Sequence, residues 1–254
     1  MMMENFAPEA PHLSIAVYPS SEEDQALRGV YEVLHKANRM TDTCLVLAPE
    51  GARFEAISDL ADSIRVVDLD EDPAASGIFE LDGPRVVRVR LLDEEHGVVV
   101  LGYERAGRDE SHPVSLVLSA DALGVPSYLW TDEEGRRARS LGRWARRTLR
   151  LVCDSLDPLY GHLAVEETLP PPSEFRKGVE HVRGEFYVSQ RLVGGRSEFV
   201  DSLVKDYGAS LVSTWGRGYF ICGWPPFGGP GLTDDETRML ELRMTEFLAE
   251  RTGS

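Results

Sequence analysis

Three side chains with acid–base chemistry lie close together in the middle of the sequence. Asp157, Tyr160 and His162 fall within one short segment, and a carboxylate near an imidazole is a common general acid–base pair. Asp157 and His162 are an odd number of residues apart, so a regular strand would direct them to opposite faces. Pro158 interrupts such a strand and leaves a shared site open. A structural role for His162 remains the more frequent outcome.

A second group of candidate residues is aromatic. Trp215 belongs to a hairpin pattern around Gly216-Arg217-Gly218, whereas Trp224 and Phe227 flank two prolines in a loop. Core packing is the usual role of such residues, but bulky apolar groups in loops often contact partners. The sequence therefore predicts a partner-binding set: Asp157, Tyr160, His162, Trp215, Trp224 and Phe227.

The alternative is a small-molecule enzyme or a ligand-binding protein with a pocket near Asp157, Tyr160, His162 and Trp215. Convergence of these four side chains on one cleft would favour it. The sequence contains no phosphate-binding loop, no dinucleotide fingerprint, no zinc-protease motif and no hydrolase nucleophile motif. The acidic segment from Asp68 to Asp72 lacks the glycine and glutamate of a calcium loop. We therefore predict no metal and no cofactor, favour a non-catalytic protein, and leave catalysis open.

The charge balance limits the choice of partner. The 254 residues include 43 Asp and Glu but only 27 Lys and Arg, a net charge of −16. That excess argues against nucleic acid and anionic membranes, whose recognition depends on Lys and Arg. A basic protein partner is expected instead, because opposite charge accelerates its encounter. Three widely spaced cysteines and an N-terminus without a signal-peptide pattern predict a cytoplasmic protein with free thiols.

One segment runs against this acidic background. Seven arginines occur between residues 136 and 150, at the three- and four-residue steps of a helix face. Like charges at that spacing repel, and a helix tolerates them when carboxylates from elsewhere lie alongside. The sequence thus predicts that Arg139, Arg143 and Arg146 pair with acids of the same molecule. A scaffold that docks an acidic partner through this helix is a further alternative.

The periodicity of apolar residues predicts the elements that position these side chains. Alternation with a period of two between residues 85 and 118 indicates an antiparallel meander. Three- and four-residue spacing predicts helices near residues 21–38, 132–152, 197–207 and 233–250. Further strands are expected at residues 13–18, 44–47, 64–67, 159–166, 184–189, 211–215 and 219–222. We expect a single α+β domain, residues 1–254, with antiparallel sheet covered by helices; 1–125 and 131–254 are the alternative subdivision.

The order of several short motifs resembles one class of bacterial polymorphic-toxin immunity proteins. The motifs are Asp157-Pro158-Leu159-Tyr160-Gly161, the aromatic strand Phe186-Tyr187-Val188-Ser189, and the hairpin Trp215-Gly216-Arg217-Gly218-Tyr219 before a C-terminal helix. The resemblance covers roughly residues 85–250. It implies a single α+β domain without enzymatic activity that binds a cognate toxin or effector and blocks it. The acidic surplus fits this expectation independently.

Overall fold

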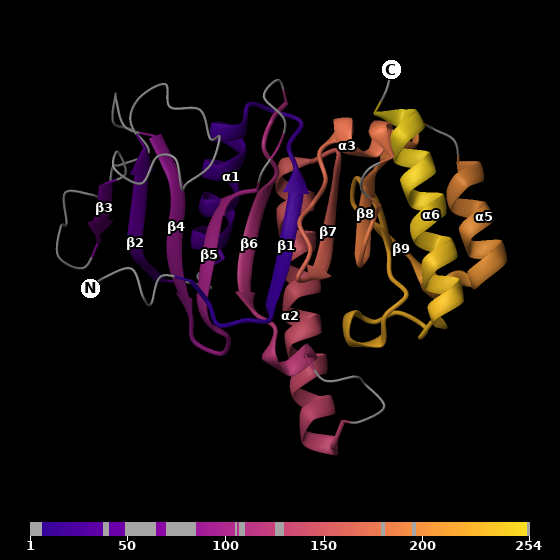
Figure 1. Cartoon of the computed structure of the whole chain (residues 1–254), viewed down its shortest axis with the longest axis horizontal. Helices are drawn as coiled ribbons and strands as arrows, with labels where there is room; N and C mark the ends of the chain where they lie inside the picture. Colours follow the sequence, from indigo (N-terminus) through magenta and orange to yellow (C-terminus); the bar gives the residue numbers. More distant parts are fainter. Residues whose placement is uncertain are drawn as a thin grey trace.

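A single antiparallel sheet forms the centre of the molecule. The computed structural model describes residues 7–37, 41–48, 65–69, 85–104, 106, 110–124, 130–178, 181–194 and 197–252. Its strands follow the order β3-β2-β4-β5-β6-β1-β7-β8-β10-β9, and neighbouring strands pair antiparallel throughout (Figure 1). The predicted antiparallel α+β fold is therefore confirmed.

The bounds of the described elements are as follows. The strands are β1 His12–Tyr18, β2 Thr41–Ala48, β3 Arg65–Asp68, β4 Arg85–Asp93, β5 Gly97–Tyr103, β6 Val114–Ser119, β7 Tyr160–Val165, β8 Glu185–Ser189, β9 Val212–Trp215 and β10 Gly218–Ile221. The α-helices are α1 Glu23–Lys36, α2 Asp132–Leu156, α3 Pro172–Lys177, α4 Gln190–Val193, α5 Ser197–Tyr207 and α6 Asp234–Arg251. Short 3-10 turns are η2 Asp121–Leu123, η4 Ala209–Leu211 and η5 Pro225–Phe227. None of the helices in these described segments is long and apolar enough to cross a bilayer.

The first strand joins the two parts of the sheet. β1 pairs with β6 on one side and with β7 on the other. In Figure 1 the N-terminal strands β2 to β6 lie on the left of β1, and β7 to β10 lie on the right. The sheet is thus continuous across the boundary between the two predicted subdivisions, while the number of domains stays a prediction.

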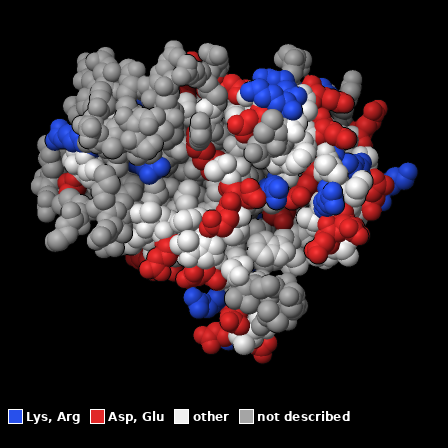
Figure 2. Space-filling view, viewed as in Figure 1, with Lys and Arg blue, Asp and Glu red and all other residues white. Residues whose placement is uncertain are grey.

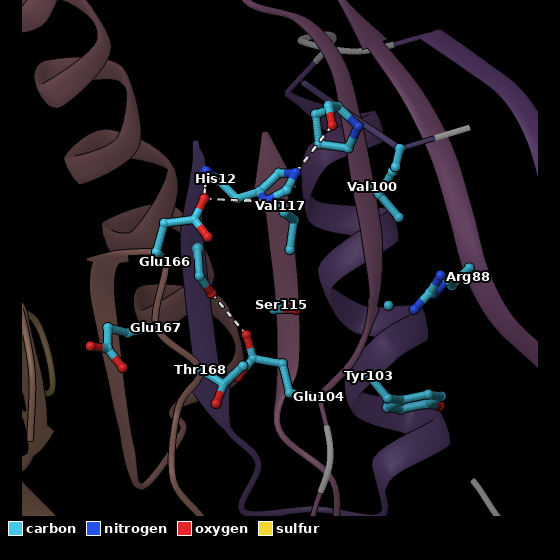
Figure 3. Close-up of a pocket in the computed structure, with 14 residues that line it drawn as sticks. His12, Arg88, Val100, Tyr103, Glu104, Ser115, Val117, Glu166, Glu167 and Thr168 are labelled. Atoms are coloured by element: carbon cyan, nitrogen blue, oxygen red, sulfur yellow. Dashed lines mark hydrogen bonds and ion pairs between the residues drawn. The ribbon is translucent and has the colours of Figure 1, made fainter. Parts of the chain in front are cut away.

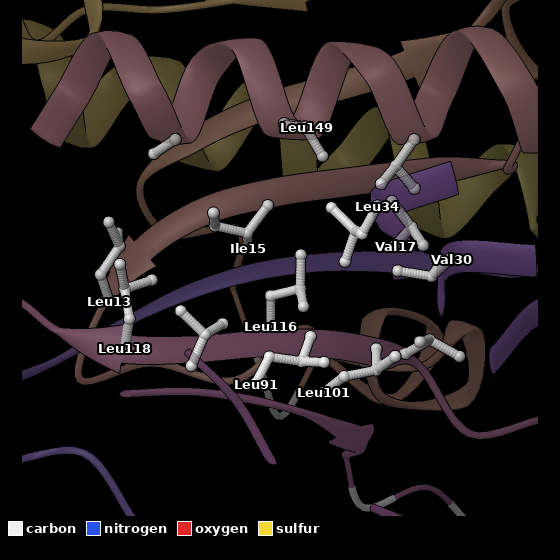
Figure 4. Close-up of a cluster of buried hydrophobic side chains, with 14 of the residues drawn as sticks. Leu13, Ile15, Val17, Val30, Leu34, Leu91, Leu101, Leu116, Leu118 and Leu149 are labelled. Carbon is white, nitrogen blue, oxygen red and sulfur yellow. The ribbon is translucent and has the colours of Figure 1, made fainter. Parts of the chain in front are cut away.

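Helices α1 and α2 cover the back face of the sheet. Leu13, Ile15 and Val17 alternate along β1 toward this face, where Leu149 of α2 packs above them (Figure 4). A capping box of Thr131 and Glu134 starts α2, because the Thr131 side chain accepts from the Glu134 amide and the Glu134 carboxylate accepts in return. This cap fixes where the long helix begins.

Helix α2 also crosses the turn η5 at very short range. A β-carbon added to Gly142 would lie 2.0 Å from the carbonyl oxygen of Pro226. Only a residue without a side chain permits this approach of two backbones. The crossing ties the back face to the loop that follows β10.

The front face changes character at β1. On the C-terminal side it is apolar, with Tyr160, Phe186 and Ile221 buried beneath α3, α5 and α6. On the N-terminal side the same face carries Ser14 and Ser115, and no described helix covers it (Figure 1). A helix needs apolar surface to pack on, and this polar half of the face offers little of it to the described helices.

A few sequence-based details differ in the structure. The apolar spacing of the sequence includes His35 in α1 and Met239 in α6, yet His35 is exposed and Met239 has 54% of its surface exposed. The buried apolar residues of α6 are Leu240, Met244, Phe247 and Leu248, and Met239 lies off their stripe because one residue turns a helix by about 100°. The proline-rich segment Pro170-Pro171-Pro172, whose composition is typical of a loop, runs into the short helix α3. Residues 124–130, whose sequence is typical of a linker, and the acidic segment after Asp68 lie largely outside the described residues.

Candidate functional site

The open half of the front face holds a groove of about 320 Å³, which we call the front groove. Its described lining comes from β1, β4, β5, β6 and the segment after β7 (Figure 3). The side chains that define it are His12, Ser14, Arg88, Glu104, Ser115 and Glu166. The volume falls within the range of small-ligand sites.

The groove exists because small residues occupy neighbouring positions on adjacent strands. Gly102 on β5 pairs with Arg88 on one side and with Ser115 on the other. Residues at such positions share one face of the sheet. With no side chain at Gly102, the aliphatic part of Arg88 lies across β5, where an added β-carbon would sit 3.0 Å from its Cγ.

Glu104 is a buried carboxylate at the floor of the groove. Its Oε1 accepts from the Ser14 hydroxyl at 2.8 Å, and its Oε2 accepts from the Leu169 amide at 2.6 Å. Burial raises the pKa of Glu104 to about 7, although hydrogen bonds from Leu169, Ser14 and Ser115 oppose the shift. Glu104 is therefore only partly ionised near neutral pH.

Arg88 forms the opposite side of the groove. It is about half-buried, and it makes no ion pair with a carboxylate within the described segments. Burial lowers the pKa of the Arg88 guanidinium, and no charge among the described residues offsets that effect. Arg88 thus offers up to five donors to a group that enters the groove.

Acidic side chains form the rim of the groove. The amide of His12 donates to the Glu166 carboxylate, and the His12 ring approaches the same carboxylate at 3.3 Å. The side chains of Glu166 and Glu167 are 54% and 39% exposed, so both meet solvent. Figure 2 shows that Asp and Glu are more widespread than Lys and Arg over the described part of this face.

A second cavity of about 550 Å³ lies beside the first, at the ends of β7 and β8 and the start of α6. Glu167 lines both cavities. The buried carboxylate of Glu185 accepts from the amides of Gly223 and Trp224 at 2.7 and 3.0 Å. Burial raises the pKa of Glu185 to about 7. These two hydrogen bonds hold the loop in place, and Trp224 of that loop lines the cavity.

The four residues of the predicted small-molecule pocket do not share a cleft. Tyr160 and His162 point to the front face, because they pair with Tyr18 and Ala16 of β1. Trp215 lies on the back face, stacked on Phe220 at 4.3 Å between ring centroids. The alternative pocket near these residues therefore lacks the convergence that would support it.

Asp157 lies apart from both faces, at the C-terminal end of α2. It adopts a left-handed conformation with φ 48° and caps the helix. Its Oδ2 lies 3.2 Å from Arg191 and 3.6 Å from Arg217. These contacts connect the end of α2 to α4 and to the β9–β10 turn, which is a structural role.

His162 is buried within the sheet and neutral. It is 1% exposed, and its Nε2 has no hydrogen-bond partner among the described groups. Burial lowers the pKa of His162 to about 3. Such an imidazole does not exchange protons near neutral pH, so its position gives it no acid–base role there.

The predicted partner-binding set is largely buried. Tyr160, His162, Trp215 and Phe227 expose at most 2% of their surface. Trp224 is partly exposed and lines the second cavity with Phe227. Asp157 is also partly exposed. Partner binding by this set stays a prediction, with Trp224 and Asp157 as its accessible members.

Sequence reasoning did not single out the groove residues Arg88, Glu104 and Ser14. A signal was present, because Arg88 and Ser115 stand on the polar side of the predicted alternation. The missing information was the pairing of β1 with β6, which brings Ser14 beside that meander. Pairing between distant strands is not encoded in local periodicity.

The predicted pairing of the α2 arginines is wrong for the described residues. Arg146 donates to the Phe227 carbonyl and to the Ser213 hydroxyl instead of a carboxylate. Arg139 and Arg143 are exposed and meet no described carboxylate within ion-pair distance. Arg150 pairs with Asp154 one turn later, at 3.5 Å. The arginine row therefore faces solvent except at Arg146, which is half-buried against η5 and β9.

Comparison with known proteins adds little to this geometry. No protein-family model matches the chain, and no curated protein sequence matches it. The chain resembles the structure of the Pseudomonas aeruginosa T6SS protein PA0821, with a TM-score of 0.44 and 12% sequence identity. That match covers 94% of this chain and 72% of the other. A resemblance this distant bears on neither function nor partner.

Proposed function

We propose that this chain is a non-catalytic immunity or inhibitor protein that binds and neutralises a bacterial toxin or effector. One observation carries the proposal: half of the front face is uncovered by any described helix and has an acidic rim formed by Glu166 and Glu167. A basic segment of the partner would lie across this rim. The net charge of −16 favours rapid capture of such a partner.

The positions of the acid–base residues also favour binding over catalysis. His162 is buried as a neutral group, and Trp215 lies on the other side of the sheet from it. Trp224, beside the second cavity, extends the proposed contact surface with an aromatic group. Aromatic side chains commonly dominate the energy of a protein interface.

The test uses the product of the adjacent reading frame as the candidate partner. Co-expression should protect cells from that product. Titration calorimetry should give a dissociation constant that rises as salt is added, because salt screens the opposite charges. The double variant Glu166→Gln and Glu167→Gln should weaken binding about tenfold, mainly through slower association.

A charge-matched control separates the rim from the overall charge. Glu198 and Asp201 are exposed on α5, away from the groove. The double variant Glu198→Gln and Asp201→Asn removes the same charge and should change affinity less than about twofold. Equal effects of the two double variants would leave no specific role for the rim and would contradict the proposal.

A further inference from the structure

The front groove carries opposite charges on its two sides. Arg88 extends from β4 across Gly102, and the Glu104 carboxylate is held toward β1 by the Ser14 hydroxyl. Figure 3 shows these two groups on opposite sides of Ser115. Such an arrangement distinguishes the floor of the groove from its rim, where Glu166 and Glu167 lie.

Arg88 and Glu104 do not form an ion pair with each other, as two charged groups with a purely structural role would. Arg88 has no described carboxylate partner although it is substantially buried. A buried cation of this kind gains free energy when an anion reaches it. Two carboxylate oxygens provide about four lone-pair sites, so Glu104 can accept one further donor beside Ser14, Ser115 and Leu169.

The geometry points to the front groove as a binding site for a zwitterion, with its carboxylate on Arg88 and its ammonium group at Glu104. Ser115 and Thr168, between and beside these groups, supply hydroxyls for the middle of the ligand. Val100 and Val117 contribute apolar wall for a short methylene chain. This inference does not rest on the proposed function, because the site is complete within one chain.

The same chemistry has two sources, a free ω-amino acid and the C-terminal residue of a peptide that ends in lysine. In both, a carboxylate and an ammonium group are separated by several methylene groups. The volume of about 320 Å³ accommodates either. The experiment therefore contains one arm for each source.

In the first arm, ω-amino acids from 4-aminobutyrate to 6-aminohexanoate are titrated into the full chain, and their binding is measured by NMR. Each is compared with the amine and the carboxylic acid of the same length. One length of the zwitterion should bind at least about tenfold more tightly than either single-charge probe, because both charges are then paired. Equal binding by the single-charge probes, or no saturable binding by any zwitterion, would overturn the inference.

Variants test which residue binds the carboxylate of the ligand and which binds its ammonium group. Arg88→Met should lose the preference for a carboxylate while it keeps affinity for the amine, and Glu104→Gln should do the reverse. Arg90, two residues along β4 and outside the described groove lining, provides the matched control Arg90→Met, which should bind as the parent does. An unchanged probe preference in Arg88→Met, with the protein folded by circular dichroism, would exclude Arg88 from the site.

The second arm compares Nα-acetyl-lysine with a tetrapeptide that ends in lysine, with a free or an amidated C-terminus. Tighter binding of the free-terminus peptide would identify a peptide terminus as the source, and equal or weaker binding would identify the free solute. Amidation should weaken binding at least about tenfold in either case, because it removes the carboxylate. Equal affinity of the amide and the free-terminus peptide would contradict the assignment of Arg88. Partner affinity, measured separately with the Glu166 and Glu167 variants, distinguishes failure here from failure of the proposed function.

Discussion

The guanidinium of Arg146 donates to the main-chain carbonyl of Phe227, 3.1 Å away, and so ties the middle of α2 to the turn η5. The same side chain donates to the Ser213 hydroxyl at 2.8 Å and lies 5.4 Å from the centre of the Phe220 ring. We predict that Arg146→Gln lowers the free energy of unfolding by about 2 kcal/mol, because both hydrogen bonds come from a charged donor. Urea denaturation at neutral pH measures this change.

The control for that prediction is Arg143, one turn away but exposed and without a described ion pair. Arg143→Gln should change stability by less than about 0.5 kcal/mol, with a slight gain as repulsion along the arginine row decreases. If Arg143→Gln proved as costly as Arg146→Gln, the contacts to η5 would not be the cause.

Two glycines of α2 should respond to alanine in opposite directions. Gly142→Ala would place a β-carbon 2.0 Å from the Pro226 carbonyl, so we expect a loss of about 3 kcal/mol. Gly135→Ala would place a β-carbon 3.3 Å from the flexible end of Arg139 and in ordinary contact with the Trp130 ring at 3.7 Å, so it should gain about 0.5–1 kcal/mol from higher helix propensity. Thermal melts of both variants give the comparison, and a neutral Gly142→Ala would contradict the close crossing of α2 and η5.

His162 should make the protein sensitive to acid. Its pKa in the folded state, about 3, is below its ordinary value of 6.5, so the unfolded chain binds the extra proton first. The stability that neutral His162 contributes is present above pH 6.5 and is lost as the pH falls toward 3. Between pH 7 and pH 4.5 the loss is about 2–3 kcal/mol. His162→Leu should remove that part of the slope in urea titrations, and an unchanged slope would mean that His162 is not buried as a neutral group.

Glu104 should make the protein less stable as the pH rises, which is the opposite of the effect of His162. Its folded pKa of about 7 is above its ordinary value of 4.5, so its contribution is complete below pH 4.5 and is lost as the pH rises through 7. We predict that Glu104→Gln recovers about 2–3 kcal/mol at pH 7.5 relative to pH 4.5. The glutamine can keep both contacts, since its amide oxygen accepts from Leu169 and its NH₂ group donates to Ser14. Equal pH profiles for the variant and the parent would contradict a buried, partly neutral Glu104.

The local pattern of the sequence predicts many helices and strands but little of how they pair and pack against one another. The alternation of Val87, Val89 and Leu91 with Arg88 and Arg90 identified β4 and its buried side, because each strand obeys a two-residue period on its own. The capping residues Thr233 and Glu236 likewise marked the start of α6. These signals are local, and the structure confirms them.

The candidate site depended on relationships that local patterns do not contain. Ser14 reaches Glu104 because β1 inserts between β6 and β7, far from both in sequence. The aromatic residues were assigned to a contact surface, yet Trp215 stacks in the core, since hydrophobicity alone does not distinguish burial from contact. That none of the described helices lies over the polar half of the front face also becomes apparent only from the assembled sheet.

The central place of β1 has a consequence for how the chain is made. Its partners β6 and β7 are synthesised about a hundred residues or more after it. Until they emerge, neither edge of β1 has a strand to pair with. Until then, neither part of the sheet is joined to the other. Deleting residues 12–18 would leave β6 and β7 as open edges, which are the usual starting points of aggregation. β1 is thus synthesised before both of its partner strands and can be fully paired only once β7 has emerged.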